Sequence, residues 1–262
     1  MSDAPEYIEV GTGAGARRIA VRKQAGTAPG ILWLGGFKSD MRGTKAEALA
    51  QHAERMGRAC VRFDYSGHGE SEGRFEDGTI SRWLEESLAV FEREAKGPQI
   101  VVGSSMGGWI ALLLARALTQ RAAKNTNLAG LVLIAPAADF TEELMWAQFS
   151  PEIKSEIEEK GFWQRPSEYG DGPYPITRAL IEDGRKHLLL KGPIAIGCPV
   201  RILQGVKDPD VPFAHAMKLV SYLAQDDVVL TLVKDGDHRL SRPEDLERLL
   251  RTIDELSATL ET

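Results

Sequence analysis

The sequence contains only two cysteines, Cys60 and Cys198, which lie far apart and belong to no Cys-x-x-Cys pair. This scarcity excludes the disulfide framework of small secreted domains and favours a reducing compartment. The sequence also lacks a His-Glu-x-x-His motif, a phosphate-binding P-loop and any Cys/His cluster. We therefore predict neither a metal ion nor any other cofactor.

Long apolar runs and dense basic runs are absent as well. The longest apolar stretches, 109–115 and 131–138, are far shorter than the roughly 18 residues that span a bilayer. With 32 basic and 38 acidic residues the net charge is −6, which argues against a nucleic-acid partner. Residues 1–6 are acidic and precede no apolar segment, unlike a targeting leader. We expect a cytoplasmic protein without a membrane span, and the sequence contains no signal for an oligomeric state.

The residues that are present suit one soluble domain of 262 residues, 43% of them hydrophobic and 27% charged. Short apolar runs alternate with helix-patterned segments, which is typical of an open parallel sheet with helices on both faces. No repeat or low-complexity tract divides the chain, so we predict a single domain over residues 1–262. The predicted strands are residues 18–22, 31–34, 60–64, 100–103, 131–135, 200–204 and 228–233.

Local signals predict where three helices begin. Residues 44–47, Thr-Lys-Ala-Glu, have the pattern of a capping box, and the helix that they open ends at Gly57. Thr79 begins a second amphipathic helix, and residues 241–244 begin a third. The glycine-rich segment 11–15 precedes a strand pattern rather than a helix, so we predict a hairpin turn there and not a dinucleotide-binding loop.

Residues from about 139 to 191 interrupt the sheet pattern. This segment is too long for an ordinary connection, and it contains charge-rich helical stretches and a Pro/Gly-rich hinge at 170–175. We predict a helical lid insertion. Its aromatic residues suit either an apolar acyl pocket or the core of the lid itself. They are Trp146, Phe149, Phe162, Trp163, Tyr169 and Tyr174.

The motif that points to chemistry is Gly-Ser-Ser-Met-Gly at 103–107, which has the pattern Gly-x-Ser-x-Gly. It stands between an apolar strand and an apolar helix, the context of a nucleophile elbow. The sharp turn exposes the central side chain, and the flanking residues are small because a Cβ there would collide with a neighbouring element. We predict that Ser105 is the nucleophile, since Ser104 does not fit the frame. The structural alternative is a tightly packed strand-to-helix junction.

A serine nucleophile needs a base that takes its proton and a third group that orients the base. In chains with this elbow the acid and then the histidine follow, each in a loop after a later strand. Asp208 follows the predicted strand 200–204, and His238 follows the last predicted strand, 228–233. We predict Asp208 as the acid and His238 as the base.

Other residues compete for these roles. Asp210 is an alternative acid, although its place just before Val211 and Pro212 favours a helix cap. Asp139, after an earlier strand, is a second alternative and also fits a cap. His68 lies in a turn-rich loop that leaves a strand, where it either supports the loop or lies next to the site.

Attack on a carbonyl creates a negative oxygen that needs preorganised hydrogen-bond donors. The backbone N–H of Met106, at a helix N-terminus, is one predicted donor. The second is the N–H of Phe37, in the loop after strand 31–34, where Gly35 and Gly36 let the backbone approach a substrate. The alternative is that this glycine pair only forms a turn.

Several stretches resemble one branch of the α/β-hydrolase superfamily, that of the mitochondrial palmitoyl-protein thioesterase that also acts as a mycophenolic-acid acyl-glucuronide esterase. They are residues 36–41, 43–46, 62–67, 103–109, 134–140, 198–201, 206–208, 211–212 and 237–239. The resemblance implies the α/β-hydrolase fold, a mostly parallel eight-stranded sheet with helices on both faces and a helical lid insertion. It also implies Ser105, Asp208 and His238 as a catalytic triad.

The predicted function is that of a serine hydrolase that cleaves acyl thioesters or carboxylic esters through an acyl-enzyme intermediate. Small-molecule and lipid acyl esters or thioesters are the expected substrates, with acylated proteins as a further class. An aminopeptidase or a carbon-carbon bond hydrolase would use the same residues. A binding protein without activity would tolerate loss of any of the three, so their presence in the expected order argues against that class.

Overall fold

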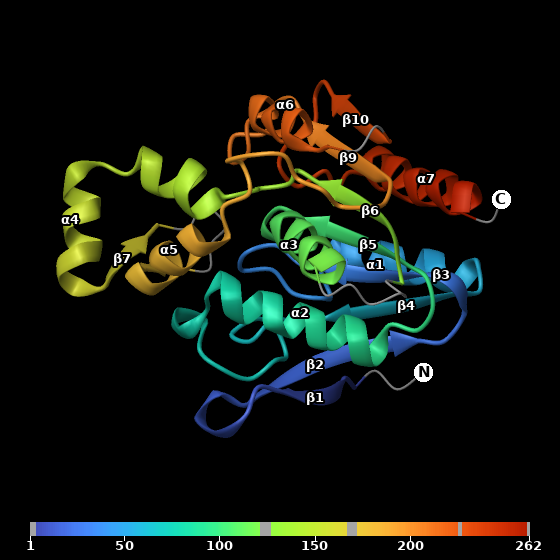
Figure 1. Ribbon diagram of the computed structural model, residues 1–262, viewed down its shortest axis with the longest axis horizontal. Helices are drawn as coiled ribbons and strands as arrows, with labels where there is room; N and C mark the ends of the chain where they lie inside the picture. Colours follow the sequence, from blue (N-terminus) through green and yellow to red (C-terminus); the bar gives the residue numbers. More distant parts are fainter. Residues whose placement is uncertain (1–3, 121–126, 167–171, 225–226, 261–262) are drawn as a thin grey trace.

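An eight-stranded sheet forms the centre of this computed structural model, which describes residues 4–120, 127–166, 172–224 and 227–260 (Figure 1). The strand order is β1-β2-β4-β3-β5-β6-β9-β10. β2 pairs antiparallel with β1 and β4, and the other pairs in the sheet are parallel. The predicted mostly parallel sheet is confirmed. Its strands are β1 (Glu6–Val10), β2 (Arg17–Gln24), β3 (Thr27–Leu34), β4 (Arg58–Phe63), β5 (Gln99–Ser104), β6 (Leu128–Ile134), β9 (Val200–Gly205) and β10 (Val228–Val233).

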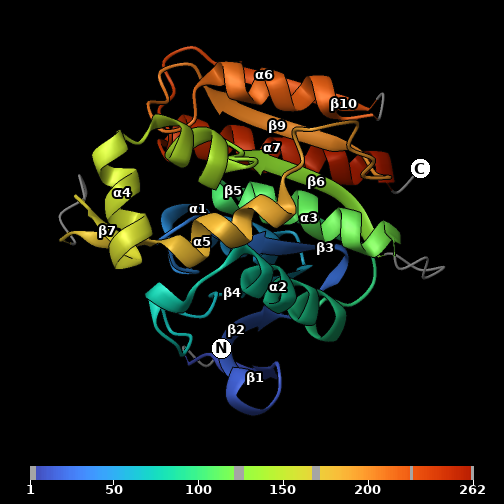
Figure 2. The ribbon, with the colours of Figure 1, turned by 60° about the vertical axis from the view of Figure 1, so that its left-hand side comes forward.

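Helices cover both faces of the sheet, as predicted. α1 and α7 pack on one face, whereas α2, α3 and α6 pack on the other. Figures 1 and 2 show α2 and α3 on the near side of the sheet and α7 behind it. These helices are α1 (Thr44–Arg55), α2 (Ile80–Glu94), α3 (Met106–Gln120), α6 (Phe213–Tyr222) and α7 (Pro243–Leu260).

The alternation of side chains along the central strands divides the core into two parts. Ile31 and Trp33 of β3 belong to the part under α1 and α7, whereas Leu32 and Leu34 belong to the part under α2 and α3. This follows because successive side chains of a strand lie on opposite faces of its sheet. Both faces are buried, which explains why β3 and β5 are almost continuous apolar runs.

Of the two predicted helix starts at Thr44 and Thr79, the structure confirms the cap of one and contradicts that of the other. Thr79 caps α2, as predicted, because its side chain accepts a hydrogen bond from the N–H of Arg82. The capping box predicted for α1 is wrong. The N-cap residue is Gly43, which has no side chain to cap the helix, and the Glu47 carboxylate instead binds Arg62 of β4 at 2.6 Å.

The segment between β6 and β9 leaves the sheet as the predicted insertion, and it projects to the left in Figure 1. It is mainly helical, with a π-helical turn (Thr141–Met145), α4 (Pro151–Lys160) and α5 (Arg178–Gly184). It also contains an antiparallel hairpin of β7 (Phe162–Arg165) and β8 (Tyr174–Thr177). The sequence pattern did not indicate these strands, since four residues give too short an alternation. Tyr169, Gly170 and Asp171 lie outside the described residues.

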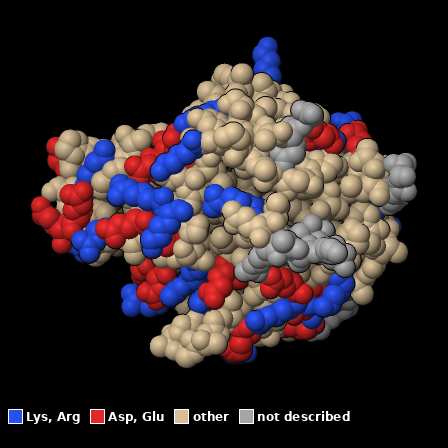
Figure 3. Space-filling view, in the orientation of Figure 1, with Lys and Arg blue, Asp and Glu red and all other residues tan. Residues whose placement is uncertain are grey.

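Basic and acidic side chains are mixed on the surface of the insertion, at the left of Figure 3. Several form ion pairs, among them Arg185 with Glu142 at 2.8 Å and Lys160 with Glu156 at 3.2 Å. Within the described ranges, no helix combines the length and the apolar character that crossing a bilayer requires.

Candidate active site

Ser105 stands at a sharp turn between β5 and α3. Its φ is 55°, in the left-handed region that residues with a Cβ seldom occupy. Two backbone hydrogen bonds hold the turn: the N–H of Ser105 donates to the carbonyl of Ile134 at 2.8 Å, and the carbonyl of Ser105 accepts from the N–H of Gly108 at 2.9 Å. This strained, fixed geometry is that of a nucleophile elbow, which presents its side chain at the edge of the sheet.

The two glycines of the motif let α3 approach the sheet closely. A Cβ added to Gly107 would lie 2.1 Å from the carbonyl oxygen of Leu34, and one added to Gly103 would lie 2.3 Å from the carbonyl oxygen of Gly107. Both neighbours are backbone atoms of packed elements, so they have little room to move.

We therefore expect Gly107→Ala to lower the free energy of unfolding by about 3 kcal/mol or more, as overpacking against rigid backbone does. Urea denaturation followed by circular dichroism would measure this change. Gly192→Ala is the matched control, because no atom lies within 4 Å of its added Cβ. Equal stability of the two variants would contradict the close approach of α3 to β3.

His238, in the loop between β10 and α7, connects Ser105 to Asp208. Its Nε2 lies 3.1 Å from Ser105 Oγ, and its Nδ1 lies 2.8 Å from Asp208 Oδ2. A carboxylate only accepts hydrogen bonds, so Nδ1 carries the hydrogen and Nε2 is left to accept from the serine hydroxyl. The structure thus brings together the three predicted residues, which come from three separate loops.

The Asp208 side chain is completely buried and surrounded by donors. Its Oδ1 accepts from the N–H groups of Asp210 at 2.9 Å and Val211 at 2.8 Å. Its Oδ2 accepts from Gln204 Nε2 at 3.2 Å as well as from His238. These bonds compensate for the burial of an ionised carboxylate and fix its orientation.

The two alternative acids have other positions. Asp210 is exposed, and the helix cap predicted for it is wrong: no side chain caps α6, and the N–H of Asp210 is bound to Asp208. The cap predicted for Asp139 is also wrong. Its buried carboxylate accepts from the N–H groups of Leu189 and Leu190, and it therefore fastens the far end of the insertion to the point where the insertion begins.

Phe37 and Met106 lie beside Ser105 along one cavity. Within the described part of the chain, the N–H of neither residue makes a hydrogen bond to another protein group. Gly36 lies close to the nucleophile, since a Cβ added to it would be 3.5 Å from the Cβ of Ser105. Two unused backbone donors therefore flank the serine.

His68 supports the loop that contains Phe37. Its Nε2 accepts from the N–H of Lys38 at 3.1 Å, and its Nδ1 donates to the carbonyl of Ser66 at 3.3 Å. Burial lowers the pKa of His68 to about 4, so the ring is neutral at physiological pH and keeps this arrangement. The sequence does not decide the role of His68, because pairing of β3 with β4, which brings the two loops together, is a tertiary feature.

A cavity of about 500 Å³ opens in front of Ser105, within the usual range for sites that bind small molecules. The insertion forms part of its wall with Phe140, Leu144, Met145 and Tyr174. The ring of Phe37 packs against Phe140 and Tyr174, with ring centroids 5.7 and 6.0 Å apart. The insertion therefore contacts the loop that contains one of the two unused donors.

Among the described residues, a metal ion could be held by Asp208, Asp210 and His238, because each offers an oxygen or nitrogen within 4.8 Å of the others. In the structure, however, the carboxylate of Asp208 and the ring of His238 are bonded to each other. This arrangement suits a base and its orienting acid.

The fold agrees with comparisons to known proteins. Residues 28–249 match the model of the alpha/beta hydrolase family. The chain belongs to this family. The human mitochondrial palmitoyl-protein thioesterase ABHD10 is 39% identical over 245 residues, which are 93% of this chain and 78% of that protein. The predicted resemblance to this branch of the α/β hydrolases is therefore confirmed.

Solved structures of α/β hydrolases extend the likeness to three dimensions. A crystal structure from Agrobacterium vitis S4 is 50% identical in sequence and has a TM-score of 0.92, covering 97% of this chain and 98% of that one. Mouse alpha/beta hydrolase domain-containing protein 10 is 35% identical and has a TM-score of 0.85, covering 97% and 99%. The insertion is thus part of an architecture that both structures share over nearly their whole lengths.

The expected cytoplasmic location is contradicted by these relatives. The five ABHD10 proteins that are 36 to 39% identical to this α/β hydrolase are all named as mitochondrial. The expectation depended on the acidic character of residues 1–6, and the charge of these residues does not determine a compartment. The prediction of a cytoplasmic protein was therefore wrong.

Proposed function

We propose that this protein is a serine hydrolase that cleaves acyl thioesters or carboxylic esters through an acyl-enzyme intermediate. The observation that carries the proposal is the hydrogen-bonded chain from Ser105 through His238 to Asp208, of which Ser105 and His238 line the cavity. Relatives named as palmitoyl-protein thioesterases support acyl thioesters as the substrate class.

In the first half of the reaction, Ser105 Oγ attacks the acyl carbonyl while His238 Nε2 takes the hydroxyl proton. The carbonyl oxygen becomes negative and accepts from the N–H groups of Phe37 and Met106, which have no protein partner to give up. Asp208 stabilises the imidazolium that forms. As the intermediate collapses, the carbon–sulfur or carbon–oxygen bond breaks, and His238 returns the proton to the leaving thiol or alcohol.

In the second half, a water molecule replaces the leaving group. His238 Nε2 takes one proton from this water, whose oxygen attacks the acyl carbon of the ester to Ser105. The same two N–H groups bind the new oxyanion. The acid leaves, Ser105 Oγ recovers the proton from His238, and the site returns to its first state.

The insertion is the proposed lid, and its apolar side chains are the proposed acyl site. Leu144 and Met145, from its first turns, line the cavity near Phe37 and Phe140. Each methylene that leaves water contributes about 0.8 kcal/mol, so an apolar wall favours longer acyl chains. Half-buried Leu144 offers a position where this wall can be changed without opening the core.

We expect kcat/KM for p-nitrophenyl esters to rise from acetyl to longer acyl chains by at least about tenfold, the effect of one to two extra buried methylenes. Leu144→Asn should lower kcat/KM for long chains by about tenfold and leave the acetyl ester nearly unchanged. Leu250→Asn is the matched control, since Leu250 is also half-buried but belongs to α7, which packs on the other face of the sheet.

A flat chain-length profile, or a preference for acetyl, would contradict the acyl site. A parallel panel of acyl thioesters and aminoacyl amides separates thioesterase activity from peptidase activity. Failure of a fluorophosphonate probe to label Ser105, together with no turnover of any ester or thioester, would overturn the proposed function itself.

A further inference from the structure

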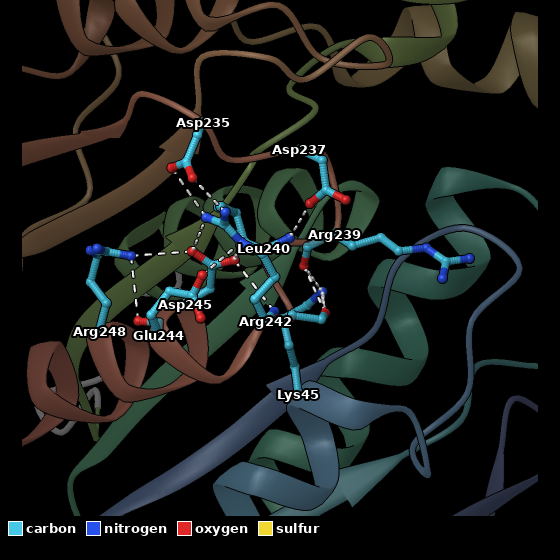
Figure 4. Close-up of polar contacts among 10 residues, drawn as sticks. Lys45, Asp235, Asp237, Arg239, Leu240, Arg242, Glu244, Asp245 and Arg248 are labelled. Atoms are coloured by element: carbon cyan, nitrogen blue, oxygen red, sulfur yellow. Dashed lines mark hydrogen bonds and ion pairs between the residues drawn. The ribbon is translucent and has the colours of Figure 1, made fainter.

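The loop that contains His238 has a conformation that needs support. Leu240, two residues after the histidine, is buried and has a φ of 43°, which is strained for a bulky side chain. Within the loop, the N–H of Leu240 donates to Asp237 Oδ1 at 3.0 Å. At its end, Arg242 binds Asp235 at 2.7 Å and Asp245 at 2.8 Å (Figure 4). These contacts tie the loop to itself and to α7.

Lys45, at the start of α1, binds the same loop from the other side of the site. Its Nζ donates to the carbonyl oxygen of Arg239, the residue that directly follows His238, and to Ser241 Oγ at 3.3 Å. Ser241 Oγ in turn donates to the same carbonyl at 3.0 Å. Figure 4 shows Lys45 reaching up from α1 to this part of the loop. The contact joins residues that are 194 positions apart in the sequence.

The position of Lys45 is unfavourable for the stability of its own helix. It is the second residue of α1, where the positive end of the helix macrodipole repels a cation. Burial lowers the pKa of Lys45 to about 8, which reflects the free energy spent on removing an ammonium from water. Asp237 and Asp245 attract it and Arg239 repels it, but among the described residues no carboxylate binds it directly.

We propose that Lys45 is a positioning residue for His238: by holding the carbonyl of Arg239, it fixes the histidine loop against the start of α1. This inference rests on the proposed role of His238 as the base. α1 begins directly after the loop that contains Phe37. A single ammonium therefore links the support of the base to the support of one oxyanion donor.

The expected effect follows from the geometry of proton transfer. The imidazole has to keep Nε2 within hydrogen-bond distance of Ser105 Oγ, and the two atoms are 3.1 Å apart in the structure. Later in the reaction Nε2 has to reach the leaving group and then the water molecule. A displacement of about 1 Å in such a group can lower the rate about a hundredfold. Loss of the hydrogen bond from Lys45 to the Arg239 carbonyl should therefore lower kcat and leave substrate binding unchanged.

Lys45→Met keeps the length and the apolar stem of the side chain but cannot donate a hydrogen bond. We expect kcat for a p-nitrophenyl ester to fall by about ten- to a hundredfold, with KM within about twofold. Lys45→Arg, which can donate to the same carbonyl, should recover most of the loss. Lys234→Met, at an exposed lysine of the same loop, is the control and should match the parent.

A double-mutant cycle with His238→Ala distinguishes positioning from direct contact with substrate, since Lys45 also lines the cavity. If Lys45 acts through the imidazole, Lys45→Met should change the residual activity of His238→Ala by less than about twofold. An equal loss in both backgrounds, or a rise in KM alone, would overturn the proposal and indicate substrate binding.

Thermal unfolding and near-ultraviolet circular dichroism establish that each variant is folded. If Lys45→Met does not fold, Ser241→Ala takes its place, because it removes the second donor to the Arg239 carbonyl; kcat should then fall by about two- to fivefold at constant KM. Unchanged kcat in the folded variant, with the parent active and Ser105→Ala inactive, would overturn the role of Lys45 and leave the proposed function intact. A parent without any acyl hydrolase activity would overturn both.

Discussion

Ser105→Ala should lower kcat/KM for acyl esters and thioesters by about 10⁴- to 10⁶-fold while the protein remains folded. The expected loss is large because the hydroxyl oxygen forms the covalent bond to the acyl group, and the methyl group of alanine has no nucleophilic atom to take its place. The residual rate reports what the two backbone donors and the cavity achieve alone. Steady-state kinetics and labelling by a fluorophosphonate probe both measure the effect.

Ser104→Ala is the control for this experiment. Ser104 is the last residue of β5, and its position does not fit the elbow frame. We expect its kcat/KM to stay within about threefold of the parent and its labelling to be normal. Labelling of Ser105→Ala at the parental rate would show that another residue is the nucleophile.

Asp208→Asn should lower kcat by about 10³- to 10⁴-fold with little change in KM. The reason is the set of donors around the carboxylate. The N–H groups of Asp210 and Val211 both point at Oδ1, so the oxygen of an asparagine amide would take that place. Its NH₂ group would then face His238, whose Nδ1 would have to accept. The hydrogen would move to Nε2, which could no longer take the proton of Ser105.

The control is Asp210→Asn, which makes the same chemical change on an exposed side chain two residues away. Asp210 was the alternative acid, and the structure places Asp208, not Asp210, in hydrogen-bond contact with the imidazole. We expect Asp210→Asn to keep kcat within about threefold of the parent. A larger loss from Asp210→Asn than from Asp208→Asn would reverse the assignment of the acid.

Much of the fold could be predicted from the sequence because its signals are strong and local. The central strands are buried on both faces, so each appears as a short apolar run between helix-patterned segments. Segment 11–15 was predicted to be a hairpin turn and does join β1 to β2, which pair antiparallel. Its glycines look like a nucleotide loop only if the strand pattern after them is ignored.

Two errors of local prediction share one cause. Glu47 and Asp139 each have a side chain that could cap a helix from its place in the sequence. In the fold, Glu47 binds Arg62 of β4 and Asp139 binds backbone across the insertion. A cap contributes only about 1 kcal/mol, so a tertiary partner readily replaces it. Such partners are invisible in a single sequence.

The amino-acid sequence by itself determined the layered α/β architecture and the elements whose ends contain Ser105, Asp208 and His238. Hydrophobic periodicity and an elbow motif are local patterns, so they can be recognised from residues that are neighbours in the sequence. Only the tertiary structure decided that three loops meet with separations of 2.8 and 3.1 Å, and that His68 and Lys45 support the two loops beside the serine. Those contacts depend on strand order and helix packing, which bring together residues that are 30 to 194 positions apart.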